Sequence, residues 1–313
     1  MELRQLTAVV AVSETGSVTS AARRLHVVQP AVTRQIRTLE EELGASLFHR
    51  TNQGMVPTEA GEVLLEHARR ALHELDLVRT EIRPGSSEVS GVVRLGLLES
   101  TVDLLAPHLV RGLAELHPGV ELRLMSGYSG HLQRWLDDGD VDLSLLYDLA
   151  AAPSLSVTPV AEENLWLVAP PGAGLSPERP LPWARVWEHP LVLPVAGHGL
   201  RVLIDRARPD DGTEPTVVTE VNAMRIQKAL VAAGQGWTVL PAAGVAPDIA
   251  AGTLSGAPLT GPEVSRSVVL GLPVGRRVPP AVRAVAAYVV DAARELVASG
   301  EWPGARAGVR GPT

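Results

Sequence analysis

The stretch LHVVQPAVTRQIRTLEEELG, residues 25–44, places basic and polar side chains at the start of a predicted helix and acidic side chains at its end. At about 100° per residue, one apolar stripe of this helix is formed by Val32, Ile36, Leu39 and Leu43. Pro30 suits a first helical position, because its missing N–H has no helical partner there, and Gln29 then takes the cap position. The first turns present an amide, a hydroxyl and two guanidinium groups, which are the groups that contact DNA bases and phosphates. We therefore predict a helix that enters a DNA groove by its N-terminal end.

The flanking residues complete a helix-turn-helix. Residues 2–14 have an apolar helical face, Gly16 and Ser17 end that helix and can cap the next, and residues 26–28 form a short connection into the quoted stretch. Residues 47–58 form two short extended pieces around residues 52–54, which predicts a hairpin wing. The alternative is a three-helix bundle with solvated arginines, but the turn, the basic helix and the wing together favour DNA binding.

The charge distribution agrees with a local DNA-binding surface. The formal net charge is −7, which argues against a polyanion-binding surface over the whole protein. Residues 1–87 carry ten arginines and eleven acidic residues, whereas residues 88–313 carry 18 basic and 24 acidic residues. Between Ser17 and Thr38 there are four arginines and no acidic residue. A basic footprint of this size is sufficient for a nucleic-acid contact.

The bulk composition excludes several other classes of protein. The 313 residues suffice for two or three domains, and no apolar run approaches the length of about 18 residues that indicates a membrane span. The start MELRQLTAVV lacks the basic region of a signal peptide, so we expect a cytoplasmic protein. The absence of cysteine excludes disulfides and thiolate chemistry.

The run from Met1 to about Leu65 resembles the winged helix-turn-helix of LysR-type transcriptional regulators. The matching stretches are ETGSVTSAARRLHVVQPAVTRQIRTLEEELG, LFHRT and PTEAGEVLL. The family's typical serine in the recognition helix is Thr33 here, which keeps the hydroxyl. The resemblance implies a double-stranded, inverted-repeat operator, with Arg50 on a phosphate near the wing. The expected DNA-binding residues are Arg23, Gln29, Pro30, Thr33, Arg34, Arg37 and Arg50.

A separate helix is predicted over residues 58–84, with Thr58 as its cap. Its apolar residues follow a heptad seam formed by Leu64, Ala68, Ala71, Leu75, Val78 and Ile82. The seam packs either on its own chain or on a second copy, and we favour a homodimer, because a helix-turn-helix normally contacts two half-sites. The resemblance implies that this is the linker helix through which subunits pair, and that dimers assemble into a homotetramer. We expect domains at 1–58, 59–87 (linker helix and hinge) and 88–299, with a disordered tail at 300–313.

Residues 88–299 alternate between extended and helical patterns, which predicts an α/β fold with mainly parallel sheets in two subdomains. Strands are expected at 92–98, 120–127, 141–147, 164–171, 216–221, 237–241 and 268–273. Helices are expected at about 101–117, 131–138, from 198, at 222–233 and at 279–299. The region resembles the family's effector-binding domain, of the periplasmic-binding-protein type, and is most similar to the branch of nitrogen-assimilation regulators.

A ligand site is expected beyond the carboxyl ends of the strands. Ser100 and Thr101 lie at a strand end where a helix begins, so their hydroxyls and free N–H groups suit a small anion. Capping of the helix explains the pair equally well. Arg201 is the cation that we expect to face such an anionic effector. The remaining candidates at strand ends are Ser129, Tyr147, His198 and Asn222.

An enzyme is the main alternative class. The sequence holds no phosphate-binding loop, no G-x-S-x-G motif and no H-E-x-x-H motif, and its nine histidines show no metal-ligand spacing. We therefore expect no catalytic residue, no metal and no cofactor. Two further classes stay open, an effector-independent regulator of the same fold and a solute-binding module fused to a DNA-binding head. The sequence favours a DNA-binding transcriptional regulator that responds to a small molecule.

Overall fold

The computed structural model describes residues 1–52, 54–81, 89–147, 154–209, 214–261, 264–275 and 277–308. Contacts divide the chain into two compact units, residues 1–87 together with 137–140, and residues 88–136 together with 141–313. Gln53 of the predicted wing, Ile82 of the predicted seam and the predicted hinge at residues 84–87 lie outside the described residues. In the part of the chain that is described, no helix is long and apolar enough to cross a membrane.

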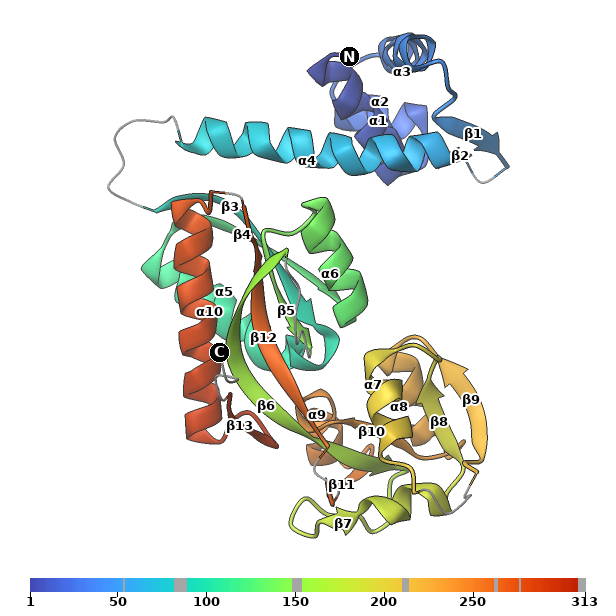
Figure 1. Ribbon diagram of the computed structural model, residues 1–313, viewed down its shortest axis with the longest axis vertical. Helices are drawn as coiled ribbons and strands as arrows, with labels where there is room; N and C mark the ends of the chain where they lie inside the picture. Colours follow the sequence, from blue (N-terminus) through green and yellow to red (C-terminus); the bar gives the residue numbers. More distant parts are fainter. Residues whose placement is uncertain are drawn as a thin grey trace. The chain divides into compact units, whose positions relative to one another are not determined.

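The N-terminal unit is a winged helix-turn-helix followed by one long helix, as predicted (Figure 1). Its elements are α1 (Leu3–Thr15), α2 (Val18–Arg24), α3 (Gln29–Leu43), β1 (Phe48–Thr51), β2 (Gly54–Pro57) and α4 (Glu59–Glu81). One core joins all four helices and includes Val9, Ala21, Val32, Leu39 and Leu65. Val32, Ile36 and Leu39 of the predicted apolar stripe therefore face the core, whereas its last residue, Leu43, is 45% exposed, and the polar first turns of α3 face away from the core.

The helix starts follow local hydrogen bonding. The Ser17 side chain caps α2 by accepting the Ser20 N–H at 3.1 Å. The N-cap of α3 is Val28, without a side-chain bond, and Gln29 is the first helical residue, so the prediction of Gln29 as the cap is wrong by one position. The shift is tolerated because the N–H of every residue in the first turn lacks a helical acceptor, which leaves Pro30 equally suitable at the second position.

The wing is held against the turn between α1 and α2. The Met55 N–H donates to the Gly16 carbonyl at 2.8 Å, and β1 pairs with β2 in an antiparallel register. Gly54 has φ of 124°, and a Cβ at this position would collide with the same Gly16 carbonyl. A glycine is therefore required where the wing meets the turn.

The predicted seam of the long helix α4 is covered near the start of the helix and exposed further along. Thr58 caps the helix by accepting the Gly61 N–H at 3.0 Å. Of the seam, Ala68 is buried in the core of the N-terminal unit and Leu64 packs against that core; Leu65, next to the seam, is buried as well. Leu75 and Val78, further along the helix, are 42% and 47% exposed. The beginning of α4 thus packs on its own chain, whereas its later apolar residues are uncovered in a single chain.

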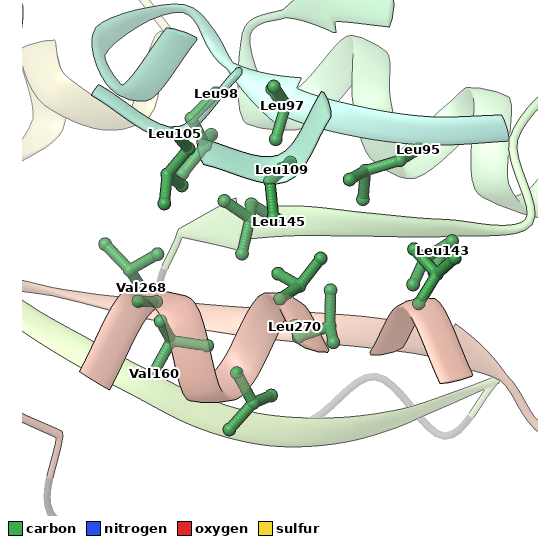
Figure 2. Packing of buried hydrophobic residues seen from close by; sticks show 14 of the residues in the cluster. Leu95, Leu97, Leu98, Leu105, Leu109, Leu143, Leu145, Val160, Val268 and Leu270 are labelled. Atoms are coloured by element: carbon green, nitrogen blue, oxygen red, sulfur yellow. The ribbon is translucent and has the colours of Figure 1, made fainter. Parts of the chain in front are cut away.

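The C-terminal unit consists of two lobes with separate cores. The first lobe contains η1 (Glu99–Thr101), β3 (Ser90–Leu98), β4 (Gly119–Gly127), β5 (Leu143–Tyr147), α5 (Val102–Leu116), α6 (Ser129–Asp138) and α10 (Pro280–Ser299). Its core lies between the sheet and the helices (Figure 2) and includes Leu95, Leu105, Leu109, Leu145 and Leu270. The strands β4, β3 and β5 are parallel neighbours in that order.

The second lobe has its own core around a parallel pair of strands. Its elements are β7 (Leu181–Pro182), η2 (Trp183–Glu188), β8 (Leu191–Pro194), α7 (Gly199–Arg206), β9 (Val217–Val221), α8 (Met224–Ala232), β10 (Thr238–Pro241), η3 (Ala242–Gly244), α9 (Ala246–Ala250) and β11 (Ser255–Thr260). The core includes Leu167, Trp183, Leu193, Ile204 and Val239. Each lobe is thus a small α/β layer structure, as the alternation in the sequence predicts.

Two long antiparallel strands, β6 (Leu155–Ala169) and β12 (Ser265–Pro273), run side by side from one lobe to the other (Figure 1). Their antiparallel pairings with each other and with β5, β10 and β11 make the sheet mixed, so the expectation of mainly parallel sheets is wrong. The first half of β6 was not expected, because Pro159 and the pair Glu162 and Glu163 interrupt its apolar pattern. Glu163 is nevertheless 1% exposed, since its carboxylate accepts hydrogen bonds from Trp302 and Tyr147.

The segment after α10 is ordered, which corrects the expectation of a disordered tail from residue 300. Trp302 is 1% exposed within the first-lobe core, and β13 (Ala305–Ala307) pairs with β6. Gly304 has φ of 67°, and a Cβ there would lie 2.9 Å from the Ala242 side chain. The glycines of this segment therefore allow close packing rather than disorder. Residues 309–313 lie outside the described residues.

Candidate functional site

The predicted DNA-reading residues all lie on the surface of the N-terminal unit. All seven are exposed, namely Arg23, Gln29, Pro30, Thr33, Arg34, Arg37 and Arg50. Gln29 to Arg37 come from the first turns of α3, and Arg50 comes from β1 of the wing. We define these seven residues as the DNA-reading surface.

The DNA-reading surface keeps most of its donors free for a partner. Arg37 donates from Nε to Glu41 at 2.8 Å, and the Thr33 hydroxyl donates to the Gln29 carbonyl at 3.2 Å. Within the described residues, Arg34 and Arg50 form no ion pair. Exposed guanidinium groups of this kind match phosphate oxygens and guanine edges in geometry.

A cavity of about 630 Å³ lies between the two lobes of the C-terminal unit. It is bordered by the carboxyl ends of β3, β4 and β5 in the first lobe and of β8, β9 and β10 in the second. Open α/β sheets bind ligands at this edge, and small-molecule sites commonly enclose on the order of 300–1,000 Å³. We refer to it as the interlobe cavity.

Five of the seven predicted effector residues line the interlobe cavity, namely Ser100, Ser129, Tyr147, His198 and Asn222. Thr101 does not, which corrects that assignment. It is 0% exposed, and its hydroxyl donates to the Leu98 carbonyl at 2.9 Å, so it stabilises the strand end. The helix α5 begins only at Val102, after the 3-10 turn η1.

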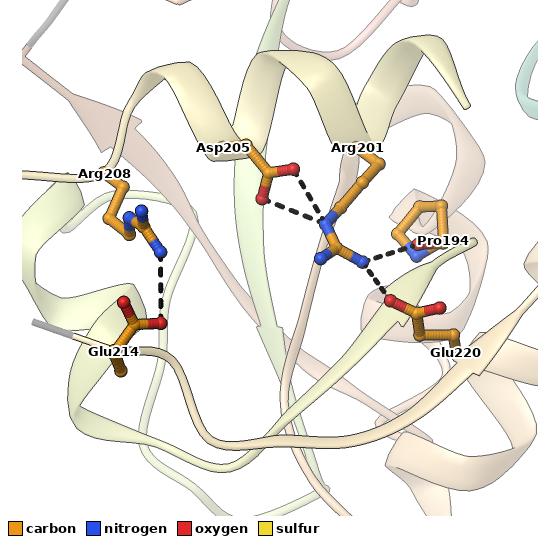
Figure 3. Close-up of polar contacts among 6 residues, drawn as sticks. All are labelled: Pro194, Arg201, Asp205, Arg208, Glu214 and Glu220. Carbon is orange, nitrogen blue, oxygen red and sulfur yellow. Dashed lines mark hydrogen bonds and ion pairs between the residues drawn. The ribbon is translucent and has the colours of Figure 1, made fainter. Parts of the chain in front are cut away.

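Arg201 is also outside the cavity lining, and its Nε and Nη1 donors are already used (Figure 3). Its Nε donates to Asp205 at 2.9 Å, and its Nη1 donates to Glu220 at 2.5 Å and to the Pro194 carbonyl at 3.2 Å. These bonds join α7 to β8 and β9. The prediction that Arg201 faces the effector is therefore wrong, because its position four residues before Asp205 on α7 favours a local ion pair.

Below the cavity, a buried polar network connects strands that are far apart in the sequence. The Ser100 and Tyr147 hydroxyls are 2.6 Å apart, and the Tyr147 hydroxyl donates to Glu163 at 3.0 Å. The second Glu163 oxygen accepts the Trp302 indole N–H at 2.9 Å. The Arg266 guanidinium lies 3.6 Å from the centre of the Tyr147 ring.

The ionisable groups at the cavity are strongly influenced by burial. Burial raises the pKa of Tyr147 and of Tyr128 above their usual range, so both are neutral hydrogen-bonding phenols. Burial, followed by the nearby Arg266 and His131, lowers the pKa of His198 to about 4. His198 is thus a neutral ring near pH 7. Its Nδ1 accepts the Leu200 N–H at 3.2 Å, which leaves the proton on Nε2.

Sequence reasoning missed several residues of the cavity lining, among them Glu99, His131, Arg134 and Arg266. Glu99 adjoins a predicted strand end, so its neighbour Ser100 already indicated it. Arg266 gave no such signal, because it lies near the start of β12 rather than at a carboxyl end. Its place at the cavity depends on the antiparallel pairing of β12 with β5 and β6.

Two family models match this chain. Residues 3–62 match the bacterial regulatory helix-turn-helix protein, lysR family, and residues 86–294 match the LysR substrate binding domain. The chain belongs to the LysR family of transcriptional regulators. The LysR-type match spans both the DNA-reading surface and the interlobe cavity.

Curated relatives of this LysR-type chain are regulators and not enzymes. The HTH-type transcriptional regulator BbuR of Bordetella bronchiseptica is 32% identical over 94% of this chain and 90% of its own length. The nitrogen assimilation regulatory protein nac of Escherichia coli is 28% identical over 91% of this chain and 93% of its own length. Within the described residues, no cluster of histidine and acidic residues suits a metal ion.

Solved structures of full-length regulators share the fold. A full-length OxyR variant from Pseudomonas aeruginosa has a TM-score of 0.72 at 23% identity, covering 100% of this chain and 99% of that one. Full-length CbnR complexed with its target DNA has a TM-score of 0.66 at 25% identity, covering 94% of this chain and 99% of that one. This LysR-type regulator therefore has the fold of proteins that bind DNA.

Proposed function

We propose that this LysR-type regulator binds an inverted-repeat operator in the cytoplasm as a homodimer or homotetramer, and that a small molecule in the interlobe cavity controls its output. The observation that carries the DNA part is the DNA-reading surface. Its exposed residues cluster on the first turns of α3 and on the wing, where helix-turn-helix proteins contact a major groove and its flanking phosphates.

The oligomer is supported by the uncovered apolar residues of α4. Leu75 and Val78 are large, exposed and three residues apart, like the a and d positions of a heptad, and such a stripe on a helix normally packs on a partner. Two heads related by a two-fold axis also match the two half-sites of an inverted repeat.

The effector part is supported by the interlobe cavity, which combines apolar walls with convergent polar groups. Leu98, Met224 and Leu240 supply apolar surface, and the hydroxyls of Ser100 and Ser129 supply hydrogen bonds. A ligand that contacts both lobes favours one lobe arrangement over another, and only such differential binding changes the output of a regulator.

The test is operator mapping with the full-length protein. Footprinting on genomic fragments should reveal a protected inverted repeat, and candidate metabolites should change the protected pattern or its affinity. Leu75→Asp places a charge in the proposed interface, where burial without a partner is costly. We expect this variant to sediment as a monomer and to lose most operator affinity, whereas Val63→Asp, at an exposed position earlier on α4, should keep the wild-type assembly. A Leu75→Asp protein that sediments like the wild type would contradict the proposed interface.

A further inference from the structure

The interlobe cavity contains a buried cation with unused donors. Arg266 lines the cavity and is 3% exposed. Its Nε and Nη2 are buried and have no hydrogen-bond partner among the described residues. A buried guanidinium with unmade hydrogen bonds is unfavourable, so an arrangement of this kind normally has a partner that completes it.

Glu163 neutralises this charge but does not satisfy the Arg266 donors. The shortest approach of its carboxylate to Arg266 Nη2 is 3.6 Å, which is too long for a hydrogen bond. One Glu163 oxygen accepts the Trp302 indole N–H, and the other accepts the Tyr147 hydroxyl. The carboxylate is therefore held towards two other donors, and Arg266 rests against the face of the Tyr147 ring instead.

Other donors at the cavity are compatible with the same ligand group. The Ser129 hydroxyl oxygen accepts the Tyr147 N–H at 2.9 Å, which leaves its own proton for a ligand. The neutral His198 ring carries an N–H on Nε2, since Nδ1 is the acceptor of the Leu200 N–H. Both residues line the cavity together with Arg266.

The formal charges of the lining limit the ligand further. Among the described lining residues, Arg134 and Arg266 are cationic and Glu99 is anionic. Glu163 beside Arg266 adds a second carboxylate, so a ligand with two negative charges would be repelled, whereas a single negative charge can be held by the unused donors of Arg266. The walls beside these groups are apolar, which suits a compact hydrocarbon body.

We infer that Arg266 is the anion-binding residue of the interlobe cavity and that the effector is a small organic monoanion, a carboxylate or a similar oxyanion with an apolar body. This inference rests on the proposed role of the cavity as the effector site. Arg266 rather than Arg201 is the counter-charge of the ligand, because Arg201 lies outside the cavity lining and is paired with Asp205 and Glu220.

The experiment is calorimetric titration of the full-length protein with cyclopentanecarboxylate and with its neutral analogue cyclopentanecarboxamide. The carboxylate should bind at millimolar concentration, and the amide should bind at least tenfold more weakly, because hydrogen bonds to a charged partner contribute roughly one to two orders of magnitude in affinity. Equal binding of the two probes, or no binding of the carboxylate, overturns the inference. Binding of the amide alone would keep a small-molecule cavity while removing the anion, so the proposed function would survive.

Two matched variants test whether Arg266 is the residue that binds the carboxylate. Arg266→Gln should weaken carboxylate binding by roughly tenfold or more. The control Arg123→Gln, at an exposed arginine paired with Glu121, should bind like the wild type. Carboxylate binding that is unchanged in a folded Arg266→Gln protein would overturn the role of Arg266.

A second variant covers the case in which Arg266→Gln fails to fold. Glu163→Gln removes the carboxylate beside Arg266 and keeps a group that can bond to Trp302 or Tyr147. We expect it to bind the carboxylate more tightly than the wild type and to gain more thermal stability from it. Weaker or unchanged binding in this variant would show that Arg266 and Glu163 are a structural pair only, and would overturn the inference.

Discussion

The DNA-reading surface and the interlobe cavity both contain arginine, but in opposite surroundings. Arg34 is exposed on α3 and forms no ion pair with a described residue. Arg266 is 3% exposed, lies against the Tyr147 ring and has a glutamate 3.6 Å away. The first guanidinium is hydrated in the free protein, whereas the second is desolvated by folding itself.

This difference separates two kinds of recognition. An exposed arginine gains from phosphates and released counterions, so its contribution decreases with added salt. A buried arginine is screened much less, and its position is set by packing before any ligand binds. Operator binding is therefore expected to depend steeply on salt, and effector binding only weakly.

The largest expected effect is a loss of stability when the buried hydrogen bond between Trp302 and Glu163, next to Arg266, is removed. Trp302→Ala removes a fully buried ring and the indole N–H that Glu163 accepts, and it should lower the free energy of unfolding by about 3–5 kcal/mol. Trp302→Phe keeps most of the ring and should lose less. Denaturant unfolding of both proteins is the measurement. A wild-type midpoint for Trp302→Ala would show that the segment after α10 is not part of the fold.

The exposed side is tested by Arg34→Ala and Gln29→Ala. Each should reduce discrimination between operator and altered sequences by roughly 1–3 kcal/mol per bidentate base contact, with unchanged thermal stability. The control is Arg24→Ala, since Arg24 is already paired with Glu14 at 2.5 Å. Competition binding with base-substituted operators measures the effect. Unchanged operator preference in Arg34→Ala would contradict the placement of α3 in the groove.

A smaller effect is expected for the phosphate contact of the wing. Arg50→Ala should weaken binding to all sequences alike and reduce the slope of log affinity against log salt by about one unit. Affinities measured over a series of salt concentrations give this slope. A loss of sequence preference instead would mean that the wing contacts bases.

The smallest effect concerns pH. The pKa of His198, ordinarily 6.5, is lowered to about 4 by burial, then by Arg266 and His131. Between these pH values His198 is protonated in the unfolded chain and neutral in the folded chain. The free energy of unfolding therefore has its full value above pH 6.5 and decreases as the pH falls towards 4. His198→Asn keeps a capping side chain and should reduce this loss, as measured by unfolding at neutral and mildly acidic pH.

The same histidine reports on the buried cation. In Arg266→Gln the pKa of His198 should move up towards 6.5, and histidine NMR titration measures it directly. In Arg123→Gln it should stay where it is. An unmoved pKa in Arg266→Gln would show that the charge of Arg266 is not felt at His198.

The N-terminal unit was predictable because its information is local. A cap, a stripe with a period of 3.6 and a short turn lie within residues 17–44, so one window of sequence contains the whole DNA-reading helix. The cavity is lined by residues at the ends of several strands, spread between residues 98 and 266. Only the tertiary pairing of these strands brings the residues together. Ser100, Ser129 and Asn222 were found because strand ends follow a rule, whereas Arg266 depends on the course of β12.

The missed features share one cause. Glu163 and Arg266 are charged residues within strands, and the sequence pattern alone places such residues at the surface. Trp302 follows Gly300 and precedes Gly304, which suggested a flexible end. In each case the stabilising partner is far away in the chain, as with Trp302 and Glu163, which are separated by 139 positions.

The long paired strands β6 and β12 form a continuous two-stranded connection between the two lobes. The register between them shifts at Val268 and Val269, which face Ala161 and Pro159, so Val160 has no residue opposite it on β12 and Pro159 has no N–H to donate. A ladder interrupted in this way bends at the interruption, because fewer hydrogen bonds resist it. We therefore expect any change in the angle between the lobes to bend these two strands at the interruption. Arg266 lies two residues from it, so the proposed ligand would bind beside this bend.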